Sequence, residues 1–483
     1  MTHPFPTTTL PKTSSVAPAD PAAKKGIISL MVALLAACVA FQLNASMLSP
    51  VLVVMAGELR TSEVTVGLSQ TAFFTSTALF GLFLPRLSDI VGRRKILVLM
   101  VGVMVLGSIM AALAPNITVL IIARMIQGIS GAIVPVCLMV LRTKVKDARQ
   151  YGTLMGVVTA VNGGIAGIDA FAGGFLASTF GFRSIFWVIA GTGVIAVVLV
   201  NRFVPDSKPS QGVRMDWWGV LALALTILFL QTAVNELGKG AAGNGLLVLG
   251  LLIGAGACAV VFWKIEGAVR QPLATPALMK KRSTWAMLLT TTLTMTGVFA
   301  TVNGVLMSLA QNPDVGFGLK ADMASLLLLT PYALVGWIMG PFAGRMASTL
   351  GYLTILRIGL GGSTVGIVVL ALAGTQNLTF LIGGTLLLGI TYAGMANIML
   401  NGLGVVLSPA DNPGFLPGMN AASFGLGAGL SFAIMPAIQA NAGTGAAGYA
   451  TAMLVGAAIT VAALLMSLLI PRPTEAGVEV IKG

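Results

Sequence analysis

The chain has 483 residues, of which 56% are hydrophobic and only 9% are charged, and it carries a net charge of +13. Soluble domains are about a quarter charged, so this composition excludes a water-soluble globular protein and indicates a helical membrane protein. The three cysteines fall in separate apolar segments, which gives no pattern of a disulfide or metal framework.

Residues 1–25 are polar and rich in proline, threonine and serine. A signal peptide would begin with a short charged stretch followed by an apolar core, and this segment has no such core. We therefore expect residues 1–25 to be a disordered cytoplasmic tail.

Fourteen apolar segments follow, each of about the length that crosses a ~30 Å hydrocarbon core as a helix. They are 27–56, 64–85, 96–114, 117–141, 152–178, 184–203, 217–237, 245–263, 284–309, 322–343, 354–374, 379–407, 416–440 and 447–470. An even number of spans predicts that both termini lie on the same side of the membrane.

The basic residues fall mainly in alternate loops. Of the 28 Lys and Arg residues, 23 lie in the tails and loops on the predicted inner side, four lie in the other loops, and Arg124 lies within a span. This positive-inside bias predicts a multi-pass cell-membrane protein with both termini in the cytoplasm. It also accounts for the basic charge without nucleic acid as a partner.

Two polar stretches, 202–216 and 264–283, bracket the seventh and eighth spans. They predict a six–two–six arrangement. Its parts are the tail 1–25, an N-terminal six-helix bundle over 26–203, two additional helices with their linkers over 204–283, a C-terminal six-helix bundle over 284–470, and a tail over 471–483. The sequence PRLSDIVGRR (85–94) is echoed by GRMASTLGYL (344–353), and such internal repeats are typical of alternating-access transporters.

Three motifs carry a resemblance to a known family. They are LSDIVGRRK (87–95), RMIQGISGA (124–132) and PGMNAASFGLGAGLSFAI (417–434). Together they resemble the major facilitator superfamily, and within it the fourteen-helix drug:proton antiporters. The resemblance implies an all-α polytopic membrane fold with two six-helix bundles plus two extra central helices. The chain departs from the antiporter pattern at Asp169 and Ala170, where that family has Gly-Pro, and at Asn44, where it often has an acid.

The first motif implies a conformational latch formed by Asp89, Gly92, Arg93 and Arg94. By this resemblance, the Asp89 carboxylate would lie near a helix N-terminus in the other half, where the helix dipole favours it. The arginines would lie near acids such as Asp147. The alternative is that these charges only set the topology.

Arg124 and Asp169 are the one base and the one acid deep in the predicted membrane interior. At 1.5 Å per residue they lie ~12 and ~13 Å from the outer ends of sequential antiparallel helices. Either charge alone would cost at least ~2.5–3.5 kcal/mol, so we expect the two to pair. Three roles stay open: Asp169 as a proton carrier, a structural ion pair, or direct contact with substrate.

A substrate cavity is expected between the halves near the midplane. By family analogy its walls carry polar and aromatic side chains. The candidates are Gln42, Asn44, Gln70, Asn162, Asn303, Tyr332, Trp337, Tyr392, Asn397, Asn401, Asn420 and Phe424, with Phe41 as a further aromatic candidate.

These features predict a proton-coupled exporter of small apolar or amphiphilic compounds that works by alternating access. The alternative is a proton-coupled importer of a small metabolite or organic anion. An enzyme is not expected, because there is no phosphate-binding loop and the one histidine, His3, lies in the tail. The expected partners are a small-molecule substrate, protons and the lipid bilayer. The proton gradient replaces any cofactor, and a monomer is sufficient.

Overall fold

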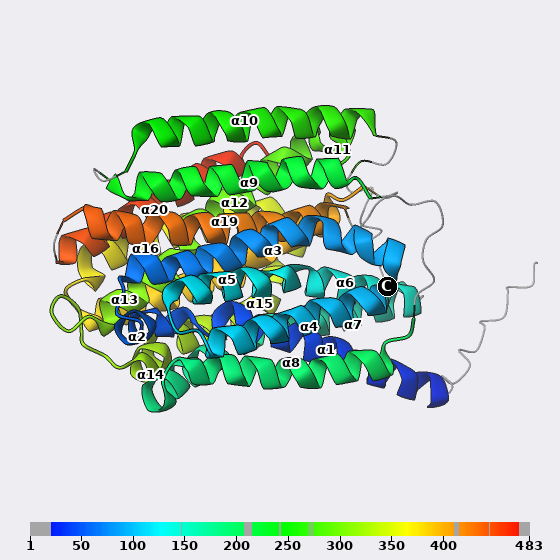
Figure 1. Cartoon of the computed structure of the whole chain (residues 1–483), viewed down its shortest axis with the longest axis horizontal. Coiled ribbons are helices and arrows are strands. Elements are labelled where there is room, and N and C mark those ends of the chain that lie inside the picture. The colour runs from blue at the N-terminus through cyan, green and yellow to red at the C-terminus, as the bar shows by residue number, and fades with distance from the viewer. Residues whose placement is uncertain are drawn as a thin grey trace, which may run out of the picture.

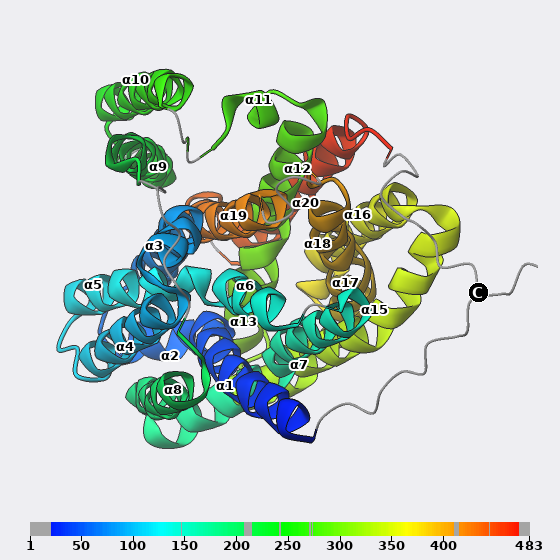
Figure 2. The same ribbon diagram turned by 90° about the vertical axis from the view of Figure 1, so that its right-hand side faces the viewer.

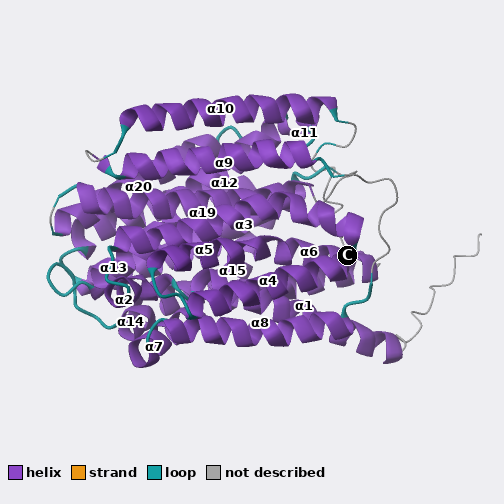
Figure 3. Ribbon diagram, viewed as in Figure 1, coloured by secondary structure: helices purple, strands orange, loops and turns teal. Residues whose placement is uncertain are grey.

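The computed structural model describes residues 21–145, 147–206, 215–240, 243–269, 272, 274–409, 415–443 and 445–472. Within these residues all regular secondary structure is helical (Figure 3). Thirteen helical stretches are long and apolar enough to cross a membrane. The 33-residue helix α7 accounts for the remaining predicted span. The all-helical fold class is therefore confirmed.

The N-terminal spans are built from eight helices and two short 3-10 turns. These are α1 (Pro21–Ser46), η1 (Ser49–Val51), α2 (Leu52–Glu58), α3 (Glu63–Val91), α4 (Arg93–Ala112), α5 (Ile117–Gly128), η2 (Ile129–Ala132), α6 (Ile133–Lys144), α7 (Ala148–Phe180) and α8 (Arg183–Phe203). Two further spans, α9 (Trp217–Gly238) and α10 (Gly245–Ala268), follow, and the short helix α11 (Pro276–Met279) leads out of them.

The C-terminal spans contain four π-helical segments, η4 to η7, where the backbone hydrogen bonds span five residues. The elements are α12 (Arg282–Ala300), η4 (Thr301–Val305), α13 (Leu306–Gln311), α14 (Ala321–Ala324), η5 (Ser325–Leu329), α15 (Thr330–Leu350), α16 (Tyr352–Val369), η6 (Leu370–Gly374), α17 (Leu378–Leu388), η7 (Gly389–Ala396), α18 (Asn397–Val406), α19 (Phe415–Asn441) and α20 (Ala446–Ser467). The described 3-10 segments belong to the N-terminal spans and the π segments to the C-terminal ones.

Local sequence explains where helices begin and end. Ser62 and Asn116 cap α3 and α5 by accepting hydrogen bonds from backbone N–H groups in the first turn. Gly92 (φ 118°) separates α3 from α4, and Gly351 (φ 85°) separates α15 from α16. Residues with a β-carbon rarely adopt positive φ, whereas glycine does so readily. Glycine therefore suits both of these breaks between helices. The two positions correspond in the predicted repeat.

The helices run side by side along the long axis of the molecule (Figure 1). The loops between α3 and α4 and between α6 and α7 carry clusters of Lys and Arg residues. We call the end of the molecule where these loops lie the inner end, and the opposite end the outer end. The two halves meet where α3 packs against α19, and Gly425 permits this close approach. A β-carbon at Gly425 would lie 3.0 Å from the Ala78 nitrogen. Viewed along the helices, α9 and α10 lie at one edge, where α9 lies next to α3 and α19 and α10 lies outside α9 (Figure 2).

Candidate transport pathway

Arg124 lies at the centre of a hydrogen-bonded network in the N-terminal half. Its Nη1 donates to Asn44 Oδ1 (2.6 Å) and Gln127 Oε1 (2.7 Å), and its Nη2 donates to Gln70 Oε1 (2.6 Å). The guanidinium also lies over the Phe73 ring, 4.0 Å from its centroid. The side chain is completely buried. Its fork of donors thereby joins α1, α3 and α5 in one place.

Asp169 is also buried, at 2% exposure, but it is bonded elsewhere. The Ser46 hydroxyl of α1 donates to its Oδ2 at 2.5 Å. Its Oδ1 has no hydrogen-bond partner among the described residues. A buried carboxylate oxygen without a donor is costly, so the described residues leave the charge of this acid only partly compensated.

The expected ion pair between Arg124 and Asp169 is wrong for this conformation: the salt bridges among the described residues do not include it. The reason lies in α1. Arg124 binds Asn44 and Asp169 binds Ser46, and residues two apart on a helix project about 200° apart at 3.6 residues per turn. Helix α1 therefore separates the two charges.

Aromatic rings connect the halves near the middle of the helices. Phe74 of α3 lies edge-to-face with Phe299 of α12, with 5.1 Å between centroids, and 6.1 Å from Phe432 of α19. Phe73 adjoins Phe74 at 5.0 Å and Phe41 at 6.5 Å. Phe41 and Phe299 are only half-buried. We call Phe41, Phe73, Phe74, Phe299 and Phe432 the aromatic cluster.

Sequence reasoning missed most of the aromatic cluster. It named Phe41 but not the other four rings. The available signal was the pair Phe73–Phe74 in a stretch of α3 that otherwise carries many Ser and Thr residues.

The predicted cavity amides fall into two groups. Asn44, Gln70 and Asn420 are buried in interhelical contacts, and Thr291 of α12 donates to Asn420 Oδ1 at 2.7 Å. The half-buried or exposed amides bond within their own helices. These are Gln42 to Ser46, Asn303 to the Phe299 carbonyl oxygen, and Asn401 to Asn397. The side chain of Asn162 lies outside the described residues.

The predicted cavity aromatics also differ in exposure. The Tyr392 hydroxyl is buried and donates to Met295 Sδ at 2.8 Å, while Tyr332 and Phe424 are half-buried. Trp337 is 54% exposed, on α15 beside the exposed Ile338 and Phe342.

The predicted latch residues bond within the N-terminal half and to the linker that follows it. Asp89 Oδ1 pairs with Arg93 Nη2 at 2.8 Å, and Arg93 Nη1 donates to the Met139 carbonyl oxygen at 2.8 Å. Arg94 pairs with Asp206 at 3.0 Å rather than with Asp147. Asp147 instead caps α7 by accepting a hydrogen bond from the Gln150 N–H. The expected contact between Arg94 and Asp147 is therefore wrong for this conformation. A latch contact across the halves stays a prediction for another conformation.

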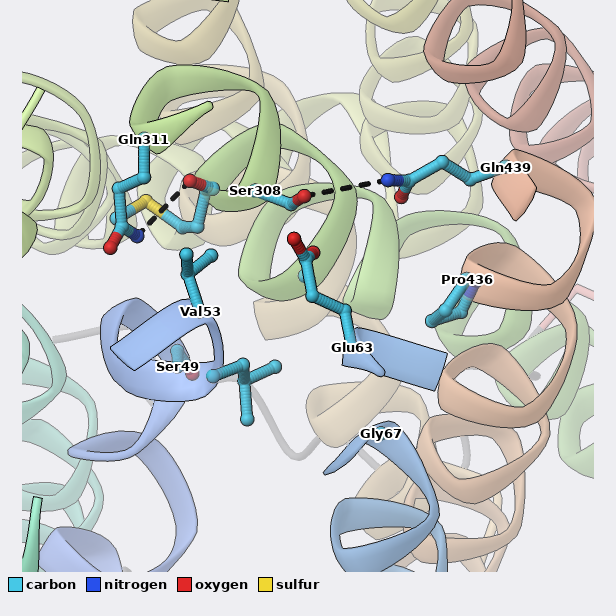
Figure 4. Close-up of a pocket in the computed structure, with 11 residues that line it drawn as sticks. Ser49, Val53, Glu63, Gly67, Ser308, Gln311, Pro436 and Gln439 are labelled. Atoms are coloured by element: carbon cyan, nitrogen blue, oxygen red, sulfur yellow. Dashed lines mark hydrogen bonds between the residues drawn. The ribbon is translucent and has the colours of Figure 1, made fainter. Parts of the chain in front are cut away.

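The outer end of the boundary between the halves is closed by polar contacts. Gln311 of α13 donates to the Pro50 carbonyl oxygen of η1 at 2.9 Å. Beside it lies a cavity of about 20 Å³, room for little more than one water molecule. The carboxylate of Glu63 points into this cavity toward Ser308, which receives a hydrogen bond from Gln439 (Figure 4). Glu63 was not predicted, because from sequence it is only an acid at the edge of a span.

The profile of the Major Facilitator Superfamily matches residues 34–431, most of the chain. The chain belongs to the major facilitator superfamily. Solved structures agree in fold. The xylose transporter XylE from E. coli has a TM-score of 0.63 at 14% identity over 93% of this chain and 98% of its own. The nucleoside transporter NupG has a TM-score of 0.60 at 14% identity over 91% and 99%.

Among proteins of the superfamily, a uridine/deoxyuridine transporter of Lactococcus lactis is 47% identical over 461 residues, covering 92% of this chain and 95% of that protein. The multidrug resistance protein Stp of Mycobacterium tuberculosis is 26% identical, covering 75% of this chain and 66% of Stp.

This chain is therefore a multi-pass secondary transporter of the major facilitator superfamily and not an enzyme. The expectation of a drug:proton antiporter is not confirmed. The uridine/deoxyuridine transporter matches this chain at higher identity and coverage than the multidrug resistance protein does.

Proposed function

We propose that this transporter carries uridine and related pyrimidine nucleosides into the cell, driven by the proton gradient. The observation that carries the proposal is the 47% identity over nearly the whole chain to a uridine/deoxyuridine transporter. We further propose that the inner end faces the cytoplasm, as the basic loops favour, and that a monomer suffices, since one chain supplies both halves of the pathway.

The aromatic cluster supports a nucleoside as the substrate. A pyrimidine ring stacks on aromatic side chains, with about 1–3 kcal/mol per base. Phe41 and Phe299 offer partly open rings from opposite halves. Gln42 follows Phe41 directly in the chain, and Asn303 lies about one helical turn after Phe299. Their amides can hydrogen-bond to uracil carbonyl and N–H groups. A neutral nucleoside also needs no opposing charge, and the central guanidinium already binds neutral amides.

Asp169 is the proposed proton carrier. Among the described residues its Oδ1 has no hydrogen-bond donor, while Ser46 holds its other oxygen on α1. A proton on Oδ1 would remove the charge of a buried acid without breaking the Ser46 contact. A buried intramembrane acid of this kind is a natural site for a transported proton.

The test is uptake of radiolabelled uridine into proteoliposomes that contain the purified full-length chain, with the lumen alkaline relative to the bath. We expect accumulation against the uridine gradient, competition by deoxyuridine, and no extrusion of ethidium. Asp169→Asn should still equilibrate uridine but not concentrate it. Asp314→Asn, in an exposed outer loop, is the matched control and should behave as wild type.

The outcomes separate the parts of the proposal. If wild type moves ethidium but not uridine, the nucleoside assignment is wrong. If uridine accumulates equally in wild type and Asp169→Asn, the substrate stands and Asp169 is not the proton carrier. If uridine leaves rather than enters under this gradient, the direction is reversed.

A further inference from the structure

The two additional helices α9 and α10 play no part in the proposed pathway, yet α9 lies over the junction of the two halves. Figure 2 places α9 beside α3 of the N-terminal half and α19 of the C-terminal half, and α9 packs against both. Helix α10 lies outside α9 and is largely exposed, as a helix that faces lipid would be. Contacts along α9 show which half holds each of its ends.

At the inner end, α9 and α10 are fastened to the N-terminal half. The Trp217 ring packs edge-on against Phe83 of α3 at 6.3 Å. Arg86 of α3 donates to the Pro272 carbonyl oxygen in the linker after α10. The same guanidinium attracts the carboxylates of Asp216, which caps α9, and Glu266 of α10, and both acids are buried. Attraction between opposite charges is stronger in a buried site than in water.

At the outer end, α9 is fastened to the C-terminal half instead. The Asn441 Nδ2 of α19 donates to the carbonyl oxygen of Gly238, the last residue of α9, at 2.7 Å. Gly238 also lies directly against α19, since a β-carbon there would be 2.7 Å from the Ala437 β-carbon. Glycine at this position permits the approach. Helix α9 thus crosses from one half to the other along its length.

Where α9 crosses the junction it carries a buried amide that no described residue satisfies. Gln231 is 5% exposed, and neither its Oε1 nor its Nε2 makes a hydrogen bond among the described residues. Its amide lies beside Gly429 of α19 and Thr75 of α3. An orphaned buried amide calls for an explanation. Because α3 and α19 must shift against each other when the transporter opens outward, that shift would change the surroundings of this amide.

We infer that α9 is a strap across the two halves that holds the outer end closed, and that Gln231 favours the opposite, outward-open state. Opening the outer end moves the outer part of α19 away from α3. Since the inner end of α9 is held by α3, its outer end must then leave α19 or bend with it. The contact of Asn441 with Gly238 therefore opposes outward opening. The Gln231 amide promotes outward opening, because no described residue pairs with it in the closed state. This inference does not depend on the substrate.

The test measures the outer opening directly, in full-length protein in lipid nanodiscs without substrate. The native cysteines Cys38, Cys137 and Cys258 are replaced by alanine, and spin labels are placed at Thr179 and Lys320, which are exposed at the outer ends of opposite halves. Distance distributions from electron paramagnetic resonance give the ratio of outward-open to outward-closed molecules.

Asn441→Ala should raise that ratio about threefold, the effect of one interhelical hydrogen bond in a membrane. Gly238→Val should raise it further by forcing α9 off α19. Gln231→Leu should lower it, since leucine leaves no amide unpaired in the closed state. Leu249→Ala, on the exposed face of α10, is the control and should leave it unchanged.

The inference is supported if Asn441→Ala raises the ratio of outward-open to outward-closed molecules and Gln231→Leu lowers it. If Asn441→Ala leaves the ratio at the parent value, or lowers it, the outer fastening does not restrain opening and the inference is overturned. If Gln231→Leu raises the ratio, the amide does not favour the open state. Gly238→Val is scored only if it elutes as a folded monomer, and Asn441→Ala decides the matter otherwise.

Discussion

Replacing Arg124 by methionine should destabilise the N-terminal half, and the size of the effect follows from its contacts. The substitution orphans three buried amide oxygens, those of Asn44, Gln70 and Gln127, which now accept at 2.6–2.7 Å. Interhelical bonds in membranes average about 0.6 kcal/mol, and typical protein hydrogen bonds reach about 1.5. Three such losses amount to about 2–4.5 kcal/mol.

The measurement is equilibrium unfolding of the purified protein in mixed micelles, followed by tryptophan fluorescence. Arg124→Lys should recover only part of the loss, because one ammonium group cannot reach acceptors on three helices at once. Arg202→Met, which removes an exposed arginine from α8, should cost less than about 0.5 kcal/mol. Equal stability of wild type and Arg124→Met would refute the idea that this guanidinium holds the helices together.

Three further predictions concern helix contacts. Gly128→Val should prevent folding, seen as loss of the monodisperse peak in size-exclusion chromatography, because a β-carbon there would overlap the Phe73 carbonyl oxygen of α3; a normal peak would show that α5 can move away. Gln311→Leu should increase the outward-open fraction in the spin-label assay about threefold, since it removes the bond to Pro50, and an unchanged fraction would count against this contact as a gate. Asp89→Asn should slow uridine uptake if a latch forms in another conformation, while its cost in unfolding free energy should stay below about 1 kcal/mol, as its ion pair is partly exposed; an unchanged uptake rate would argue for a topological role only.

The sequence was sufficient to predict the helical membrane fold. Span length and apolar composition depend on the bilayer rather than on tertiary contacts, which is why thirteen of the predicted spans reappear at nearly the same positions. The glycine breaks at 92 and 351 were also visible as a repeat. Such features are local, so a linear pattern can record them.

Contacts between side chains were harder to predict. Arg124 and Asp169 are both buried, but depth along a helix does not determine which face of the helix a residue occupies. The bonds of both residues to α1 depend on how three helices are rotated relative to one another. The aromatic cluster was missed for the same reason, because its rings come from four helices that are distant in sequence.

The π-helical segments give the two halves different mechanical properties. A π segment widens the helix and weakens its regular ladder of hydrogen bonds, so a helix bends there more easily than in an unbroken α-helical stretch. Among the described residues, four such segments interrupt spans of the C-terminal half, whereas the irregular turns of the N-terminal half are of the tighter 3-10 type. We therefore expect helices of the C-terminal half to bend during the transport cycle, while the N-terminal half moves as a rigid body.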